Sequence, residues 1–333
     1  MGRRMHRKLF CFLILCCLYG LFFNTQWIKD LFKDHNQNSV TQTHRKNIIK
    51  LVCQQNNLTF NSSYIISSFV SKQLYVEHSY KFIYCEVPKV GCTNWKRIIL
   101  LLNKTFDVSP EDLKHFDVHN HSSLVRLSTY NYSQQMEMLQ NYTKVMFVRD
   151  PLHRLVSAYR DKFLHEEDTY YSKTFADQIK AKMRKNKNSS QKVTFEEFAR
   201  FVIQEKARYR DTHWKPMHAL CDPCNIQYDI VGKFETMKED SDFVLKTIKA
   251  PKHLQYPNIK HYPNESRTNE EISIKYFNSL PPKVLEDLIN VYREDFSLFQ
   301  YLPVNHTKNT KNTREISKSA LSFTSLSSSS FLK

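Results

Sequence analysis

Short apolar runs alternate with amphipathic segments through the middle of the chain. The first run, residues 82–87, is rich in strand-forming side chains, and in residues 94–102 the apolar positions recur every three or four residues. The alternation predicts strands at residues 82–87, 144–148 and 229–234 and helices at residues 94–102, 152–163 and 240–248. A strand followed by a helix, repeated, is typical of an α/β domain with a central parallel sheet flanked by helices.

Two more helices are predicted further along the chain. Thr194, with Glu197 three residues later, has the pattern of a capping box, so a helix is expected to begin there. Residues 280–299 form the last helical stretch. We expect a single folded domain at residues 72–303, a length that suits one hydrophobic core.

The two ends of the chain differ from this middle part. Residues 1–8 carry four basic side chains and precede the apolar residues 9–28, which predicts a cytoplasmic tail and a signal-anchor transmembrane helix, with a cleaved signal peptide as the alternative. Residues 29–71 are polar and are expected to form a luminal stem. Serine dominates residues 304–333, where we expect disorder.

Glycosylation signals support this topology. Nine asparagines begin an N-x-[ST] sequon, all after the apolar segment: Asn57, Asn61, Asn103, Asn120, Asn131, Asn141, Asn188, Asn264 and Asn305. Sequons are used in the secretory lumen, so we expect the domain to be luminal. The formal net charge of +16 favours acidic partners, such as nucleic acid, anionic lipid or acidic polysaccharide, without choosing among them.

Cysteine usage is consistent with an oxidising compartment. The five cysteines after the apolar segment are Cys53, Cys85, Cys92, Cys221 and Cys224. An odd number leaves at least one thiol free or paired between chains. Cys221 and Cys224 have the spacing of half a zinc site, but no second pair completes it, so disulfides with one another or with the other three are expected.

The segment PKVGCTN, residues 88–94, joins the first predicted strand to its helix. The first turn of a helix has unpaired N–H groups and partial positive charge, and Gly91 would let the main chain approach an anion there. Lys89 adds a full charge, and Thr93 and Asn94 add polar groups. The Walker pattern G-x-x-x-x-G-K-[ST] is absent. An ordinary strand-to-helix turn is the alternative.

The end of the second strand offers a second anion site. Arg149 stands at the carboxyl edge of the predicted sheet, where ligands bind, and Pro151 fits the first turn of the next helix. Arg149 offers a planar fork for phosphate, and Ser157 offers a hydroxyl two turns later. Two sites on neighbouring strand ends predict a ligand with two separated anionic groups. For Arg149 and Asp150 a local ion pair is the alternative.

These motifs resemble those of a known family. PKVGCTNWKR and RDPLHRLVSAYRDKF are similar to the 5′-phosphosulfate and 3′-phosphate loops of Golgi carbohydrate sulfotransferases, the group that makes 4-O-sulfated chondroitin, dermatan and N-acetylgalactosamine termini. The stretch HWKPMHALCDPCNIQYDIVGKFE resembles the same group, so the similarity runs from about residue 81 to residue 301. It implies one sulfotransferase-type domain with a P-loop-like nucleotide site, in a type II protein of the Golgi membrane.

The resemblance also implies an activity and partners. Sulfate would move from 3′-phosphoadenosine-5′-phosphosulfate to a sugar hydroxyl, with position 4 of N-acetylgalactosamine as the expected acceptor. The expected partners are a glycan or proteoglycan and the Golgi membrane, and not nucleic acid. No metal is expected, because a lysine and a helix terminus can stabilise the charge that develops on the leaving phosphate.

Individual residues receive roles from the resemblance. Pro88, Lys89, Val90, Gly91, Cys92, Thr93 and Asn94 would hold the 5′-phosphosulfate, and Arg149, Asp150, Pro151, Arg154 and Ser157 the 3′-phosphate. Lys89 is expected at the bridging oxygen. Lys96, Arg97, Arg160 and Lys162 are expected on exposed helix faces, either along the path of an acidic acceptor or simply in solvent.

The acceptor hydroxyl needs a general base, and histidine suits the task because its pKa lies near the working pH. The candidates are His115, His119 and His121, between the two loops, and His213. His119 is favoured, because its VHNH stretch resembles the family segment upstream of the 3′-phosphate loop. His213 comes second and is expected to shape the acceptor pocket. A structural histidine is the alternative for each.

Two other functions fit part of the sequence. A type II Golgi glycosyltransferase would share the anchor, stem and sequons and would need a D-x-D metal motif. Asp240-Ser241-Asp242 has that form but is expected to open and cap a helix. A membrane-anchored protein that binds polyanions without catalysis would explain the charge but not two anion loops at adjacent strand ends.

Overall fold

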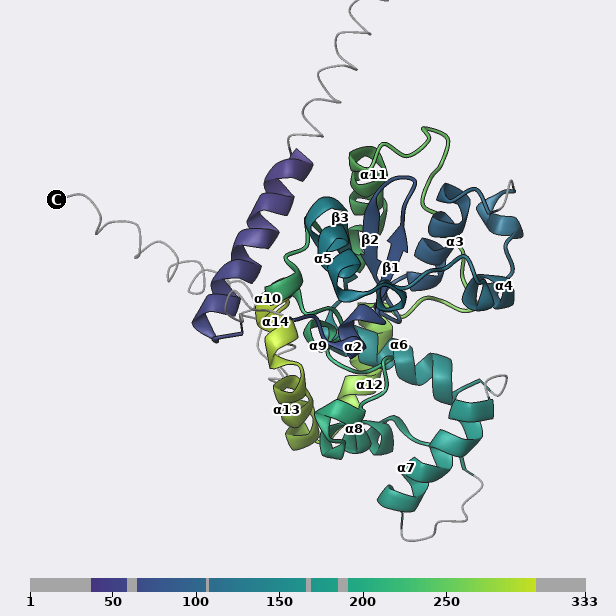
Figure 1. Ribbon diagram of the computed structural model, residues 1–333. Coiled ribbons are helices and arrows are strands. Elements are labelled where there is room, and N and C mark those ends of the chain that lie inside the picture. The colour runs from purple at the N-terminus through teal and green to yellow at the C-terminus, as the bar shows by residue number, and fades with distance from the viewer. Residues whose placement is uncertain (1–36, 59–64, 106–107, 166–168, 185–190, 304–333) are drawn as a thin grey trace, which may run out of the picture. The chain divides into compact units, whose positions relative to one another are not determined.

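The computed structural model describes residues 37–58, 65–105, 108–165, 169–184 and 191–303 (Figure 1). The expected cytoplasmic tail, signal anchor and serine-rich tail lie outside these ranges. Within them, no helix has both the length and the apolar composition needed to span a bilayer.

A four-stranded sheet forms the centre of the α/β domain (Figure 1). In their order across the sheet, its strands are β1 (Leu74–Glu77), β2 (Phe82–Cys85), β3 (Thr143–Val148) and β4 (Ile230–Lys233). β2, β3 and β4 are parallel, as predicted, and follow the order of the chain. β1 was not predicted and pairs antiparallel with β2, so the sheet is mixed at this edge.

Helices surround the sheet. They are α2 (Ser68–Ser71), α3 (Cys92–Leu102), α4 (His115–Asn120), α5 (Tyr132–Asn141), α6 (Pro151–Phe163), α7 (Ala176–Met183), α8 (Phe195–Gln204), α9 (Met217–Cys221), α10 (Pro223–Ile226), α11 (Met237–Thr247), α12 (Glu270–Asn278), α13 (Pro282–Val291) and α14 (Arg293–Phe299). The helices predicted after each parallel strand are confirmed. The last predicted stretch is two helices, because the chain breaks at Tyr292.

Local signals placed some helix ends well. Thr194 Oγ1 accepts from the Glu197 N–H at 3.2 Å, and the Glu197 carboxylate accepts from the Thr194 N–H at 2.8 Å, which confirms the capping box of α8. The prediction for α11 was wrong by three residues. This helix begins at Met237, so Asp240 does not open it.

Aromatic side chains fix α3 onto the sheet. Trp95 of α3 is fully buried between Tyr84 of β2 and Phe147 of β3, with ring centroids 5.5 and 5.1 Å apart. Phe147 in turn requires Gly232 on β4, because a Cβ at that position would lie 2.2 Å from the Phe147 ring. This packing holds the ends of β2, β3 and β4 in one fixed arrangement.

Within the expected stem of residues 29–71, residues 37–55 form a helix that packs on the domain (Figure 1). Arg45 donates to the Asp240 carboxylate and to the Val231 carbonyl, each at 2.7 Å. Gln42 contacts the same two residues, donating to Asp240 at 3.2 Å and accepting from the Val231 N–H at 2.9 Å. Polar side chains of residues 37–55 make these contacts, which explains why a segment that packs on the domain has a polar composition.

Two disulfides pair the later cysteines with earlier segments. Cys53 is bonded to Cys224, and Cys85 of β2 is bonded to Cys221. Cys92 is a buried free thiol. The two cysteines of the CDPC segment therefore bind different parts of the chain. Cys221 is linked to the sheet, and Cys224 is linked to the helix of residues 37–55.

Candidate functional site

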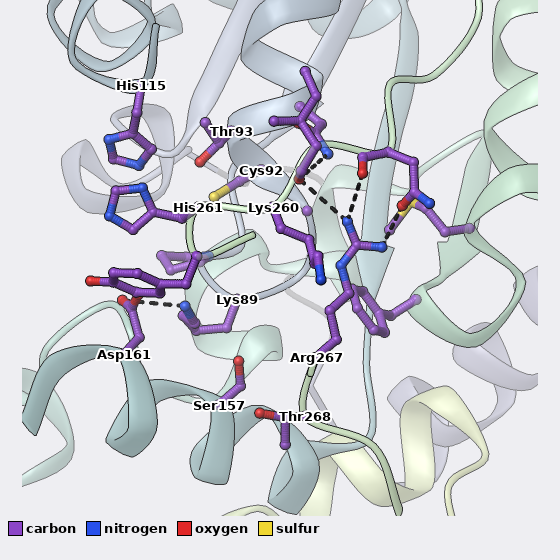
Figure 2. A pocket seen from close by; sticks show the side chains of 18 of the residues that line it. Lys89, Cys92, Thr93, His115, Ser157, Asp161, Lys260, His261, Arg267 and Thr268 are labelled. Atoms are coloured by element: carbon purple, nitrogen blue, oxygen red, sulfur yellow. Dashed lines mark hydrogen bonds and ion pairs between the residues drawn. The ribbon is translucent and has the colours of Figure 1, made fainter. Parts of the chain in front are cut away.

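A cavity of about 1270 Å³ lies where β2, β3 and β4 end. Its walls come from the loops after these strands, from α4 and α6, and from the segment between α11 and α12 (Figure 2). The predicted site residues that line it are Pro88, Lys89, Gly91, Cys92, Thr93, Asn94, His119, Arg149, Ser157 and His213. The fold therefore brings both anion loops and three of the four candidate bases, His115, His119 and His213, to one space.

The loop after β2 turns sharply into α3. Lys89 and Gly91 have φ angles of 71° and 74°, in the left-handed region that favours glycine. A Cβ on Gly91 would lie 2.2 Å from the hydroxyl oxygen of Tyr256, which donates to the Gly91 carbonyl at 3.1 Å. The first turn of α3 has neither a side-chain cap nor an acidic residue. Its N–H groups are thus suited to an external anion.

Lys89 forms an ion pair with Asp161 of α6, with 3.2 Å between Nζ and Oδ2 (Figure 2). Burial lowers the pKa of Lys89, and the Asp161 carboxylate opposes that change. Burial would raise the pKa of Asp161, but Lys89 and Lys162 lower it to about 2. Asp161 is therefore ionised and serves as the counter-ion of Lys89.

The loop after β3 presents Arg149. Its guanidinium donates to the Lys89 carbonyl at 3.1 Å and to the Thr268 carbonyl, and it lies 4.1 Å from the centre of the Phe234 ring. Burial lowers the pKa of Arg149 to about 10, so the group remains charged at neutral pH. Ser157 and Thr268 lie on the same side of the cavity (Figure 2).

Four of the expected donor-binding residues have side chains that do not line the cavity: Val90, Asp150, Pro151 and Arg154. Val90 is fully buried in the core, and Pro151 is the buried first residue of α6. Asp150 caps α6 by accepting from the N–H groups of Leu152 and His153, each at 2.9 Å. These buried residues therefore support the two loops on the side that faces away from the cavity.

Arg154 has a structural role. Its side chain is 1% exposed and donates to the carbonyls of Pro88, Lys215 and Thr212 at 2.9, 2.8 and 2.7 Å. It therefore fixes the first residue of the PKVGCTN loop against the chain that carries His213. Arg154 was expected to bind the 3′-phosphate, and its guanidinium instead links two walls of the site through these hydrogen bonds.

His119 contacts two residues of α3. Its Nε2 lies 3.0 Å from Thr93 Oγ1, and its Nδ1 lies 3.2 Å from Lys96 Nζ. Burial and Lys96 lower the pKa of His119 to about 3. Lys96 and Arg97 are 3% and 4% exposed, so the prediction that they lie on an exposed face was wrong. Lys96 pairs with Glu86 at 2.5 Å, and Arg97 donates to the Leu113 carbonyl at 3.1 Å.

His213 has an acidic partner. Its Nδ1 lies 2.7 Å from Asp211 Oδ1, and the other oxygen of Asp211 accepts from the Tyr171 hydroxyl at 2.8 Å. Burial lowers the pKa of His213, whereas Asp211 opposes this change. Neither Asp211 nor Tyr171 was identified from the sequence, although Asp211 is only two residues from His213.

The other two candidate histidines are less suited to act as a base. The His115 ring lies between the rings of His119 and His261, with ring centroids 4.3 and 4.1 Å away. Burial and the neighbouring His261 lower the pKa of His115 to about 4. His121 accepts from the Ser123 N–H through Nδ1 at 3.2 Å and does not line the cavity.

The segment between α11 and α12 supplies a wall that the sequence did not reveal. It contributes Lys260, His261, Tyr262, Arg267 and Thr268 to the cavity (Figure 2). Hydrogen bonds hold it to both loops: Asn94 donates to the Ile259 carbonyl at 3.2 Å, in addition to the Tyr256 and Thr268 contacts above. The available signal was its length, because a long segment without regular structure is commonly functional.

The D-x-D pattern does not form a single site. Asp240 accepts from Arg45 and from the Lys233 N–H at 2.9 Å and does not line the cavity. Asp242 lines the cavity and pairs with Lys238 at 2.7 Å. In the part of the chain that the structure describes, no three histidine, cysteine or acidic side chains are grouped closely enough to hold a metal ion.

The chain is similar in sequence to known proteins. The model of the sulfotransferase family matches residues 72–302. Carbohydrate sulfotransferase 8 of Mus musculus is 36% identical over 268 residues, covering 78% of this chain and 64% of that protein. Carbohydrate sulfotransferase 11 of Rattus norvegicus is 32% identical over 307 residues, covering 88% and 86%. Carbohydrate sulfotransferase 14 of Danio rerio is 34% identical over 280 residues, covering 81% and 74%.

The extent of these matches differs. The chain spans slightly less than two thirds of the length of carbohydrate sulfotransferase 8, but most of the length of carbohydrate sulfotransferase 11. No solved structure matches the chain.

Proposed function

The chain belongs to the sulfotransferase family, and on that premise we propose that it transfers a sulfuryl group from 3′-phosphoadenosine-5′-phosphosulfate to a sugar hydroxyl. One observation carries the proposal: the uncapped first turn of α3, with Lys89 beside it, shares a cavity with Arg149 and Ser157. A donor with two separated anionic groups matches these two sites. The names of the relatives, all carbohydrate sulfotransferases, support a sugar as the acceptor.

The donor would lie with its phosphosulfate against the first turn of α3 and its 3′-phosphate near Arg149 and Ser157. Gly91 lets the turn take its left-handed conformation and pack against the Tyr256 hydroxyl, which a Cβ would meet at 2.2 Å. Lys89 would leave Asp161 in part to contact the bridging oxygen. As negative charge develops on the leaving phosphate, a fixed cation stabilises the transition state more than the ground state.

The finer assignments are proposals as well. We infer position 4 of N-acetylgalactosamine, in chondroitin, dermatan or terminal glycan units, from the motif resemblance. We also infer a type II Golgi membrane protein with a luminal domain from the sequence of its first 28 residues and from the sequons. Asn57, Asn120, Asn131, Asn141 and Asn264 are exposed, which suits glycosylation. Asn61, Asn188 and Asn305 lie outside the described residues.

Asn103 is less exposed than the other sequon asparagines of the described residues. Its amide nitrogen donates to the Ser123 carbonyl at 3.3 Å, and its oxygen accepts from the Thr105 N–H at 3.1 Å.

The test of the activity is direct. The secreted chain, without its apolar N-terminal segment, is incubated with radiolabelled phosphosulfate donor and a panel of desulfated chondroitin, desulfated dermatan and oligosaccharides ending in N-acetylgalactosamine. Transfer of label to at least one glycan is expected, and analysis of the product gives the modified hydroxyl. Binding of 3′-phosphoadenosine-5′-phosphate without transfer to any glycan would overturn the carbohydrate assignment.

A further inference from the structure

We propose that the Asp161 carboxylate is a shared counter-ion, which pairs with Lys89 before the donor binds and with Lys162 once the phosphosulfate has taken its place at Lys89. This inference rests on the proposed function. It makes Asp161 and Lys162 positioning residues of the donor site. Lys162 was expected on an exposed helix face, but its side chain is only 15% exposed.

Asp161 places a negative charge inside a cavity proposed to bind anions. Asp161 and Ser157 are four residues apart on α6, so they lie on the same face of the helix, and both line the cavity (Figure 2). The carboxylate would repel a donor with two anionic groups unless a cation stayed beside it. Asp161 therefore needs a positive partner when the donor is bound.

One oxygen of Asp161 contacts two lysines. Its Oδ2 lies 3.2 Å from Lys89 Nζ and 3.4 Å from Lys162 Nζ. The side chains of the three residues are between 15% and 19% exposed, so water screens their charges only in part. Because the contact with Lys162 is already made, Lys89 can move to a ligand without leaving Asp161 unpaired.

Lys162 has a second contact that holds it in position. Its Nζ lies 4.7 Å from the centre of the Tyr171 ring, a geometry in which the ring attracts the ammonium group. The Tyr171 hydroxyl in turn donates to the Asp211 carboxylate at 2.8 Å. Lys162 is thus a partner that stays beside Asp161 when Lys89 moves.

The carboxylate also keeps Lys89 charged. Burial lowers the pKa of Lys89, Asp161 raises it, and Lys162 lowers it. Without Asp161 the pKa of Lys89 would fall further, so Lys89 would be charged only at lower pH. A bound anion would restore that charge, and the protein would take up a proton together with the ligand.

The groups around Lys89 leave a range of pH in which this proton can be measured. Those that act on Lys89 are Asp161 and Lys162 of α6, Cys92 of α3 and His213, and the other walls of the cavity add His115, His119, Lys260 and His261. Burial lowers the pKa values of His213, His115 and His119 and raises that of Cys92. From about pH 8 to about pH 9 these groups are therefore neutral. A phosphate with a second pKa of about 6 is fully ionised there.

The test measures binding of 3′-phosphoadenosine-5′-phosphate to the secreted chain by calorimetry. Titrations in two buffers with different ionisation enthalpies give both the affinity and the number of protons taken up. The variants are Asp161→Asn, Asp161→Glu, Lys162→Gln and the double variant Asp161→Asn/Lys162→Gln. Asp177→Asn is the matched control, because Asp177 is an exposed aspartate that pairs with Lys180 on α7. Thermal unfolding shows that each variant is folded.

Asp161→Asn should take up a proton on binding, rising toward about one per ligand between about pH 8 and about pH 9, because one ammonium group is recharged. The unchanged chain and Asp177→Asn should take up almost none, and Asp161→Glu should resemble them. In assays of sulfate transfer, kcat/KM for the donor should fall in Asp161→Asn by up to about tenfold per pH unit above the pKa of Lys89. The value of kcat should fall less, since bound donor recharges Lys89.

Lys162→Gln separates a shared counter-ion from a local ion pair. It leaves Asp161 with Lys89 alone, so a bound anion would face an unpaired carboxylate, and the affinity at about pH 7 should fall about tenfold. In the Asp161→Asn background that carboxylate is absent, so adding Lys162→Gln should cost less than about threefold. A lysine that only attracts the ligand by its own charge would cost the same in both backgrounds.

Proton uptake by Asp161→Asn no larger than that of Asp177→Asn would overturn the proposal. So would an equal cost of Lys162→Gln in the two backgrounds. Should Asp161→Asn fail to fold, unchanged affinity in Lys162→Gln would be sufficient to overturn it. If the unchanged chain does not bind 3′-phosphoadenosine-5′-phosphate, the proposed function fails as well. If it binds this ligand and sulfates a glycan while the variants behave like the control, this inference alone fails.

Discussion

The loops at the ends of β2 and β3 border the same cavity but offer it different groups. After β2 the main chain is exposed to a ligand: Lys89 and Gly91 are left-handed, and α3 begins without a side-chain cap. After β3 the main chain is already satisfied, because Asp150 accepts from the N–H groups of Leu152 and His153. Only side chains remain there to bind an anion.

This difference teaches how one structural unit could bind the two anions of the proposed donor in two ways. The strand, loop and helix recur, yet the residue at the N-cap decides whether the first helical turn is open. Gly91 leaves the turn of α3 open, whereas Asp150 fills the turn of α6. At the proposed second site the charge would come from Arg149 and the hydroxyl from Ser157.

The largest expected effect is at Lys89. Lys89→Ala should lower kcat about 10²- to 10³-fold, the usual cost of removing one group that stabilises transition-state charge. Assays of sulfate transfer with saturating substrates measure it, and the exposed Lys283→Ala serves as a matched control. Turnover equal to that of the control would mean that the phosphosulfate does not lie in the loop after β2.

Arg149 tests the side-chain character of the second site. Arg149→Ala should weaken binding of 3′-phosphoadenosine-5′-phosphate by about tenfold to a hundredfold, because it removes charged hydrogen bonds of about 1.5 to 3 kcal/mol. Arg149→Lys keeps the charge but not the fork, and should recover only part of the affinity. Calorimetry gives the constants, with the exposed Arg200→Ala as control. Unchanged affinity in Arg149→Ala would remove this residue from the donor site.

Gly91 tests the main-chain character of the first site. Gly91→Ala should destabilise the fold by at least about 1 to 2 kcal/mol, because alanine disfavours a left-handed φ and its Cβ would meet the Tyr256 hydroxyl. Urea unfolding measures the change. In a Tyr256→Phe background, which lacks that oxygen, the cost of Gly91→Ala should be smaller. An equal cost in both backgrounds would show that the contact with Tyr256 is unimportant.

Asp150 should have the smallest effect and the most specific one. Asp150→Ala removes the cap of α6 and should lower the free energy of unfolding by about 1 kcal/mol, while Asp150→Asn should lower it less. Thermal unfolding and calorimetry of the same samples separate stability from affinity. A loss of donor affinity as large as that of Arg149→Ala would instead restore Asp150 to the donor site.

The sequence alone determined the parts of this protein that depend on neighbouring residues. The parallel strands, the helices after them and the capping box at Thr194 were predicted, because alternation, helical spacing and caps are written in short stretches of chain. The prediction that the two loops are anion sites rests on short stretches of chain as well. Their meeting in one cavity follows from the rule that carboxyl ends of parallel strands share an edge.

Only the tertiary structure decided which distant side chains meet. It placed the polar residues 37–55 against Asp240, chose the disulfide partners, and brought the segment after α11 over the loops. It also gave the two histidines different neighbours, since His119 Nδ1 lies 3.2 Å from Lys96 Nζ, whereas His213 Nδ1 lies 2.7 Å from Asp211 Oδ1. Chemical identity is local in the sequence, but protonation and exposure depend on the neighbours that folding supplies.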